Sequence, residues 1–88
     1  IEECEITLLF VEQKNGTVKV SWRAQPGWDV SALALQLGGG GHAPAAGADI
    51  SGSLLQVQER ILQATLSWMQ NTIQQKQGTI NKTLSGVN

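Results

Sequence analysis

The sequence predicts an α/β domain: helices packed on a small mixed β-sheet, in the order β-β-α-(Gly loop)-β-α. Three observations predict it. Two β-rich segments flank an Asn-Gly turn signal, and a short segment with helical periodicity follows them. After a run of four glycines, a long helical pattern fills most of the C-terminal part. The 88 residues are enough for one domain and one modest core.

The first two elements are predicted to form a β-hairpin. Residues 6–11, ITLLFV, have little polar interruption, which predicts a strand covered on both faces. Asn15-Gly16 is a strong hairpin turn signal. The next strand alternates, so its side chains form two sets on opposite faces: Val18, Val20 and Trp22 on one, and Lys19, Ser21 and Arg23 on the other. We expect the first set in the core and the second at the surface.

A short helix is predicted over residues 30–37. Pro26-Gly27 indicates a turn before it, and the Asp29 carboxylate is suited to cap its first turn. Gly38 is placed to end it, because glycine tolerates the left-handed conformation that follows many helices. Trp28, between the turn and the helix, is expected either to pack over the start of the helix or to line a cleft.

The C-terminal part is predicted to be mainly one helix. A short strand is expected around residues 48–50, and Ser53 with Gln56 forms a capping box. The helix is expected from about residue 54 to about residue 75. The positions expected to pack on the sheet recur at steps of three and four: Leu54, Val57, Ile61, Leu62, Thr65, Trp68, Met69 and Ile73. Residues 77–88 are expected to be a flexible tail or an additional edge strand.

Composition excludes several classes of site. The formal net charge of −1 does not demand nucleic acid or a membrane as partner, although six Lys and Arg allow a local basic site. A single cysteine, Cys4, excludes an internal disulfide, and one Cys with one His cannot form a zinc site. No signal peptide or membrane-spanning apolar run is visible, so we expect a cytoplasmic protein. Because the chain begins at Ile1, we expect it to be a piece of a longer protein.

The stretch LQLGGGGHAPAAGAD, residues 35–49, is the candidate site. Consecutive glycines let the backbone approach a ligand and present N–H groups to an anion, phosphate above all. His42 can donate a hydrogen bond to phosphate, and Pro44 is expected to begin a short helical turn. The spacing fits neither a P-loop nor the dinucleotide fingerprint. The plainer alternative is a flexible surface loop with a solvated His42.

GGGGHAPAAG, together with the preceding VKVSWRA and WDVSALALQL, resembles the signature of the DHH-associated domain. This is the C-terminal accessory domain of DHH-family phosphoesterases, and the resemblance covers about residues 6–70. The full glycine run is similar to that of nanoRNA-degrading oligoribonucleases that also act as pAp phosphatases, and to that of cyclic di-AMP phosphodiesterases. The resemblance implies that Arg23 contacts phosphate or a base and that four residues contact phosphate or sugar: Gly39, Gly40, Gly41 and His42.

The resemblance also implies that catalysis and substrate binding belong to two different domains of the same protein. Manganese is expected in a separate DHH catalytic domain of the same protein, where metal-activated water attacks the phosphate. Residues 1–88 are expected to be one substrate-binding domain without catalytic or metal-binding residues, and so inactive alone. The expected partners are that catalytic domain in cis and a nucleotide or short single-stranded nucleic acid, with a homodimer through the parent protein as a further expectation.

Two alternatives to the hydrolase or exoribonuclease role stay open. One is a non-catalytic nucleotide-binding regulatory module. The other is an interaction or dimerisation domain, in which the glycine run only permits close packing. Among substrates, the residues leave nanoRNA, pAp, cyclic dinucleotides and single-stranded DNA as alternatives.

Overall fold

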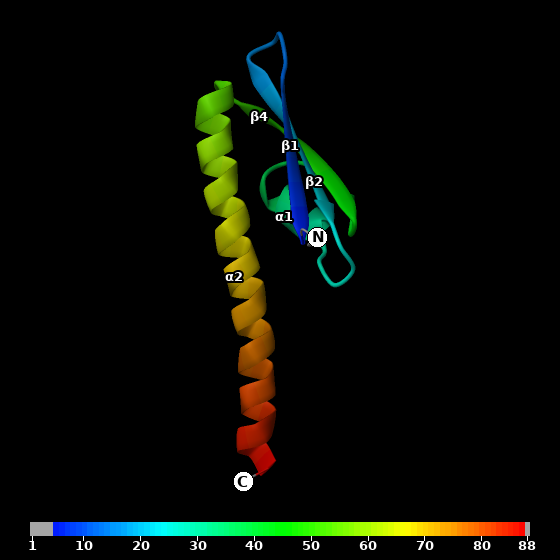
Figure 1. Cartoon of the computed structure of the whole chain (residues 1–88), viewed down its shortest axis with the longest axis vertical. Coiled ribbons are helices and arrows are strands. Elements are labelled where there is room, and N and C mark those ends of the chain that lie inside the picture. The colour runs from blue at the N-terminus through cyan, green and yellow to red at the C-terminus, as the bar shows by residue number, and fades with distance from the viewer. Residues whose placement is uncertain (1–4, 88) are drawn as a thin grey trace.

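The structure is a computed structural model that describes residues 5–87, with side-chain surroundings described through residue 74. Cys4 lies outside the described residues. The fold is a four-stranded sheet with two helices packed on it (Figure 1). The elements are β1 (Ile6–Glu12), β2 (Thr17–Ala24), α1 (Val30–Gln36), β3 (Gly40–His42), β4 (Ala45–Ser51) and α2 (Leu54–Val87). This confirms the predicted fold class and adds the strand β3 within the predicted Gly loop.

The sheet has the strand order β1-β2-β4-β3, and its pairings are all antiparallel. The prediction of a mixed sheet therefore differs from the structure in this detail. The reason is β3. A strand that directly followed the helix crossover from β2 would return parallel to β2. The β3–β4 hairpin adds one reversal, so β4 runs antiparallel to β2.

The β1–β2 hairpin is confirmed, with Gly16 at φ 81° in its turn. The prediction that β1 is covered on both faces is wrong. One face of β1 is half-buried, whereas Leu9 and Val11 on the other face are 60% and 47% exposed. The reason is position: β1 is an edge strand, and both helices pack on the same face of the sheet.

The core lies between this face and the helices. Val18, Val20 and Trp22 are fully buried, as the alternation predicts. They pack with residues of β4 and both helices: Val30, Leu33, Ala34, Ala48, Ile50, Val57 and Ile61. The Trp22 indole N–H donates a 3.0 Å hydrogen bond to the buried Thr65 hydroxyl. This bond joins the middle of β2 to α2 and satisfies both polar groups inside the core.

The predicted helix is confirmed as α1, which begins at Val30 as expected and ends at Gln36, one residue before the predicted end. Asp29 is the N-cap: its carboxylate accepts a 3.1 Å hydrogen bond from the Ser31 backbone N–H and also contacts the Ser31 hydroxyl. Gly38 has φ 87°, the left-handed conformation expected just beyond the helix end. The Trp28 ring packs on Trp68, with ring centroids 5.6 Å apart, on the helix side of the sheet.

Helix α2 begins where the capping box predicts. The Ser53 hydroxyl accepts from the Gln56 backbone N–H, and the Gln56 side chain accepts from the Ser53 N–H, both at 3.2 Å. The helix continues through Val87, so an additional edge strand over residues 77–88 is wrong, while the flexibility of that segment stays a prediction. Val57, Ile61, Thr65 and Trp68 pack inward as expected. Leu62 and Ile73 do not, being 46% and 45% exposed.

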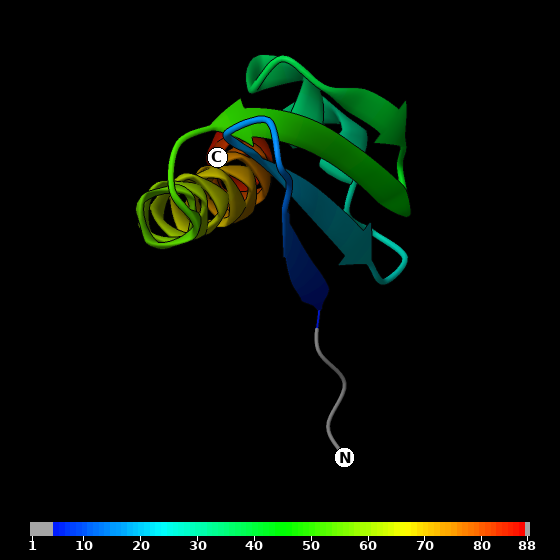
Figure 2. The same cartoon turned by 90° about the horizontal axis from the view of Figure 1, so that it is seen from above.

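Figure 2, the view from above, shows α2 nearly end-on beside the sheet, whose other side carries no helix. Over the described range, neither helix combines the length and apolar character that crossing a membrane requires. The architecture therefore leaves one face of the sheet open, and that face carries the alternate residues of β2.

Candidate functional site

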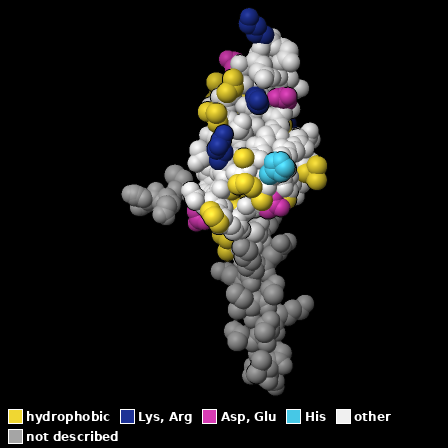
Figure 3. Space-filling view, turned by 90° about the vertical axis from the view of Figure 1, so that its right-hand side faces the viewer, with side chains coloured by type: hydrophobic (Ala, Val, Ile, Leu, Met, Phe, Trp, Pro, Cys, Tyr) yellow, Lys and Arg dark blue, Asp and Glu magenta, His cyan; other side chains and the backbone are white. Residues whose placement is uncertain are grey.

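The uncovered side of the sheet, which we call the open face, brings three predicted site residues onto one surface. Cross-strand neighbours in an antiparallel sheet point to the same side, so the register assigns residues to this face. The open face is formed by Thr7, Leu9, Val11, Lys19, Ser21, Arg23, Ala45, Gly47, Asp49, Gly40 and His42. Figure 3 looks at this side of the molecule and shows Lys and Arg side chains and the histidine exposed together with hydrophobic groups.

Arg23 and His42 lie in one row across the sheet. Arg23 is paired with Ala45, and Ala45 is paired with His42. The Arg23 and His42 backbones are thus two strand spacings apart, about 10 Å. Both side chains are exposed, and the Arg23 side chain makes no hydrogen bond or ion pair within the described part of the chain. Its guanidinium is therefore available to an anion.

The turn between β3 and β4 holds this row in place. The Ala43 carbonyl accepts a 3.0 Å hydrogen bond from the Val30 N–H at the start of α1. The Pro44 carbonyl accepts a 2.9 Å bond from the Ala24 N–H, next to Arg23. The prediction that Pro44 begins a short helical turn is wrong, because the chain reverses there into β4. The turn instead ties His42 to the end of β2 and to α1.

Two adjoining hollows lie on the open face around Gly40. One, of about 280 Å³, is lined by Lys19, Ser21, Trp22, Arg23, Gly40, Gly41, Ala45, Ala46 and Gly47. The other, of about 370 Å³, is lined by Lys19, Gly38, Gly39, Gly40, Gly47, Ala48 and Asp49. They share Lys19, Gly40 and Gly47, so together they form one groove with two cationic side chains. Its size is in the range of small-molecule sites.

The glycines of the run differ in whether the fold requires a glycine at their position. A Cβ on Gly39 would lie 2.0 Å from the Gly47 carbonyl oxygen, and one on Gly41 would lie 2.5 Å from the Ala46 Cα. These two glycines are required because β3 packs closely on β4. At Gly40, by contrast, an added Cβ would meet nothing within 4 Å. The fold does not explain the missing side chain at position 40, which borders both hollows.

The glycine run is not the loop that the sequence predicts. Residues 40–42 form an edge strand paired with β4, so their N–H groups alternate in direction rather than converging. The structure brings Arg23, Gly40 and His42 to the open face. It turns Gly41 toward the helix side and uses Gly39 to connect α1 with β3.

Two contributors to the groove were not among the individual site residues that the sequence predicts, although one of them, Gly47, falls within the candidate stretch 35–49. Lys19 was expected at the surface without a role in the site, but it lines both hollows. Lys19 and Arg23 are separated by an even number of positions on β2, so both side chains project to the same face of the sheet. This spacing is a sequence signal that could have placed Lys19 in the groove. Gly47 forms part of the floor through its register with Ser21 and Gly40, which no local signal in the sequence reveals.

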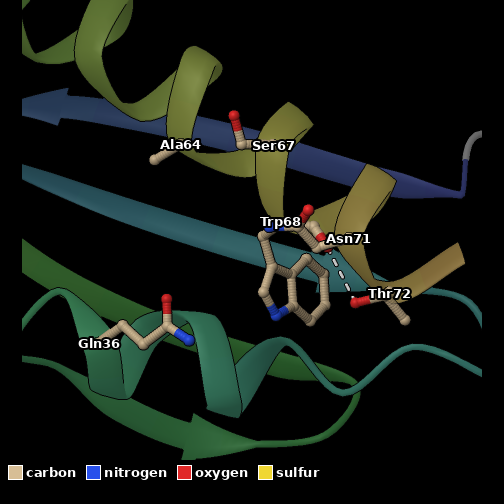
Figure 4. Close-up of a pocket in the computed structure, with 6 residues that line it drawn as sticks. All are labelled: Gln36, Ala64, Ser67, Trp68, Asn71 and Thr72. Atoms are coloured by element: carbon tan, nitrogen blue, oxygen red, sulfur yellow. Dashed lines mark hydrogen bonds between the residues drawn. The ribbon is translucent and has the colours of Figure 1, made fainter. Parts of the chain in front are cut away.

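A third hollow lies on the helix side, between α1 and α2 (Figure 4). It measures about 420 Å³ and is lined by Gln36, Ala64, Ser67, Trp68, Asn71 and Thr72. The Thr72 hydroxyl donates a 2.9 Å bond to the Trp68 carbonyl there. This hollow is larger than either hollow on the open face but has no cationic lining residue. An anionic ligand therefore fits the open face better.

The donor set of the described residues does not fit a catalytic metal. Within the described residues, no three His, Cys, Asp or Glu side chains are grouped so that they could share a metal ion. Asp49 and His42 are both on the open face, but β4 and β3 place them in different rows. We therefore derive no metal-dependent step from this chain.

Comparison with known proteins identifies the family to which this fold belongs. The DHHA1 domain family matches residues 1–71. The chain belongs to this family, and it is an accessory domain of the DHH-family phosphoesterase type.

One curated relative makes the comparison more specific. The chain is 44% identical over 63 residues to the bifunctional oligoribonuclease and PAP phosphatase NrnA of Thermus thermophilus. The match covers 70% of this chain but only 19% of that relative. The chain thus corresponds to about a fifth of the length of the relative.

Proposed function

We propose that this domain recognises the nucleotide or phosphate end of a substrate for a manganese-dependent DHH-family phosphoesterase that hydrolyses short oligoribonucleotides, pAp or cyclic dinucleotides. The named activities of the relative support the substrate class. In this proposal a DHH domain in the same protein holds the metal ions and performs hydrolysis. The chain described here binds and orients the substrate.

The observation that carries the proposal is the open position at Gly40 between two cationic side chains. Arg23 and Lys19 line the groove, and neither forms an ion pair within the described residues. A phosphate beside them gains charge-assisted hydrogen bonds, and the planar guanidinium of Arg23 suits two phosphate oxygens at once. The missing side chain at Gly40 lets a phosphate or ribose lie directly on the strand backbone.

His42 has a complementary role at the far end of the same row. Its imidazole can donate a hydrogen bond to a second phosphate or to a sugar hydroxyl. A span of about 10 Å between the Arg23 and His42 backbones suits a ligand with two separated polar groups. This favours a nucleotide with more than one phosphate over inorganic phosphate.

A titration followed by NMR tests the proposal. The labelled chain is titrated with pAp, AMP and a short RNA, and backbone amide shifts are mapped. We expect shifts at Arg23, Gly40, His42 and Gly47, with pAp producing larger shifts than AMP. Gln36 and the Trp68 indole on the helix side are the internal controls and should not move.

The parent protein supplies the second readout. Arg23→Ala in the protein that contains the DHH domain should raise KM for pAp and for a short oligoribonucleotide, while metal content stays unchanged. Shifts confined to the helix side, or an unchanged KM in this variant, would contradict the placement of the substrate on the open face.

A further inference from the structure

Asp49 is an acidic side chain that lines the groove of the open face together with its cations. It is exposed on β4, directly across from Lys19 on β2. Figure 3 shows basic and acidic side chains next to each other on this face. Neither of these two side chains makes an ion pair or a hydrogen bond with another described residue. The Asp49 carboxylate is therefore available to a ligand, like the cation across from it.

Asp49 and Arg23 lie at opposite ends of the groove. Arg23 lines only the smaller hollow and Asp49 only the larger one, whereas Lys19 lines both. Lys19 and Asp49 form a cross-strand pair four residues along β2 from Arg23, which is about 13 Å along the strand. The lining of the smaller hollow thus carries positive charge without an acidic side chain, and that of the larger hollow combines a cation with an anion.

The row of residues between these two ends leaves room for a ring-shaped group. The register places Ser21, Gly47 and Gly40 in this row. The two glycines have no side chain, and the half-buried serine has only a hydroxymethyl group. The middle row is about 7 Å along the strands from each outer row. A sugar ring can therefore lie on the backbone of the middle row, while groups on its two sides reach the outer rows.

A carboxylate at this end of the groove selects a hydrogen-bond donor. It accepts hydrogen bonds and repels a phosphate of like charge. A ribose hydroxyl is a neutral donor on the same ring that carries the phosphate, and carboxylates bind ribose 2′-hydroxyls in the dinucleotide sites of other folds. An amino group of a base is also a donor, but it lies farther from the phosphate than the sugar hydroxyl does. The short distance between neighbouring rows therefore favours the hydroxyl.

We propose that Asp49 is a specificity-determining residue, which accepts a hydrogen bond from the ribose 2′-hydroxyl of a nucleotide whose phosphate lies beside Arg23. This inference rests on the function proposed above for the groove. It gives the bound nucleotide a direction, with the phosphate at the Arg23 end and the sugar hydroxyl at the Asp49 end. It also makes ribonucleotides better ligands than deoxyribonucleotides, because the 2′-hydroxyl is the group by which they differ.

Calorimetric titration of the chain with pAp and with its 2′-deoxy form tests the proposal. We expect the wild-type chain to bind pAp about tenfold more tightly, the scale of one hydrogen bond to a charged group. Asp49→Ala should weaken pAp binding about fivefold, because the acceptor is lost. It should tighten binding of the 2′-deoxy form about twofold, because a charge that repels phosphate is removed. A merely structural role of Asp49 would instead weaken both ligands alike.

Control variants separate the ribose contact from other effects. Asp49→Asn should retain part of the preference, since its amide oxygen still accepts a hydrogen bond. Its matched control is Glu59→Gln, which neutralises an exposed carboxylate on α2, outside the groove, and should leave both affinities unchanged. Arg23→Ala should weaken both ligands by the same factor, because they have the same phosphates. Circular dichroism checks that each variant remains folded.

The parent protein provides a second readout, which does not depend on the affinity of the separate chain. The ratio of kcat/KM for a short oligoribonucleotide to that for the corresponding oligodeoxyribonucleotide reports the ribose preference. Asp49→Ala should lower this ratio towards one. Arg23→Ala should raise KM for both substrates and leave the ratio as it is.

The possible results distinguish this inference from the proposed function of the groove. If Arg23→Ala changes neither binding to the chain nor KM of the parent protein, the proposed function is wrong and the ribose contact falls with it. If Arg23→Ala weakens binding but the ribose preference is absent or survives in Asp49→Ala, only the ribose contact is overturned. A preference that appears for pAp but not for pUp would assign the donor to the base and would also overturn it.

Discussion

The two faces of β2 differ in what they require of each residue, although the residues alternate along one strand. Trp22 is fully buried, bonded to Thr65, and packed between the sheet and the helices. Arg23, its neighbour, is exposed, and its side chain makes no hydrogen bond or ion pair within the described residues. Packing in the core explains why a tryptophan stands at position 22. Nothing in the packing of the fold explains why an arginine stands at position 23. A side chain that the fold does not need is a good candidate for function.

The glycine run also combines positions that the fold requires with one that it does not, within three consecutive residues. Gly39 and Gly41 are required by close packing against β4, whereas position 40 has room for a side chain. A single motif thus combines glycines that close packing requires with one that it does not require. The comparison of the two faces leads to four predictions.

The largest effect is expected on the packed face. Trp22→Ala should lower the free energy of unfolding by about 3–5 kcal/mol, since it removes a large buried ring and leaves Thr65 without its partner. Arg23→Ala should change it by no more than about 0.5 kcal/mol. Urea unfolding followed by circular dichroism measures both. Equal losses in the two variants would remove the distinction between the faces.

The second prediction separates two adjacent glycines. Gly39→Ala should destabilise by about 1–3 kcal/mol or more, because its Cβ would collide with the backbone of β4. Gly40→Ala should leave stability unchanged or raise it by up to about 1 kcal/mol, since alanine restricts the unfolded chain. It should nevertheless weaken pAp binding by filling the floor of the groove. Thermal melts and calorimetric titration test the pair, and a Gly40→Ala variant that binds normally would count against ligand contact at this position.

The third prediction concerns the cations of the open face. Arg23→Ala should weaken pAp binding by about 1.5–3 kcal/mol, the value of a hydrogen bond to a charged group. Arg23→Lys should recover only part of this, because lysine cannot make the two parallel bonds of a guanidinium. Lys14→Ala is the matched control, since it removes an exposed cation in the β1–β2 turn, outside the groove. Equal losses for Lys14→Ala and Arg23→Ala would indicate a diffuse charge effect.

The smallest effect is expected from salt. Because Lys19 and Arg23 are exposed, raising the ionic strength should weaken pAp binding progressively through screening. The stability of the chain should change much less, since its core is apolar. Parallel titrations and melts at several salt concentrations provide the measurement. A salt-independent affinity would argue that apolar contacts, for example with Leu9, dominate binding.

Local signals predicted much of the fold. Asn15-Gly16, the Asp29 cap and the Ser53–Gln56 capping box act over a few residues, and each was confirmed. Alternation in β2 correctly separated Trp22 from Arg23 because the period of a strand is two. Of the site, the sequence predicted Arg23, Gly40 and His42 through a resemblance, and the structure places these three on one face.

The remaining features depend on which elements become neighbours. The sequence alone determined the hairpin, the helices with their caps, and the chemical character of each face of β2, since these follow from local geometry. Only the tertiary structure decided that residues 40–42 join the sheet edge, that both helices cover one face and leave β1 half exposed, and that Lys19 and Gly47 complete the groove. It also decided which glycines are required, because a close approach between β3 and β4 is a contact between strands and has no signal within either one.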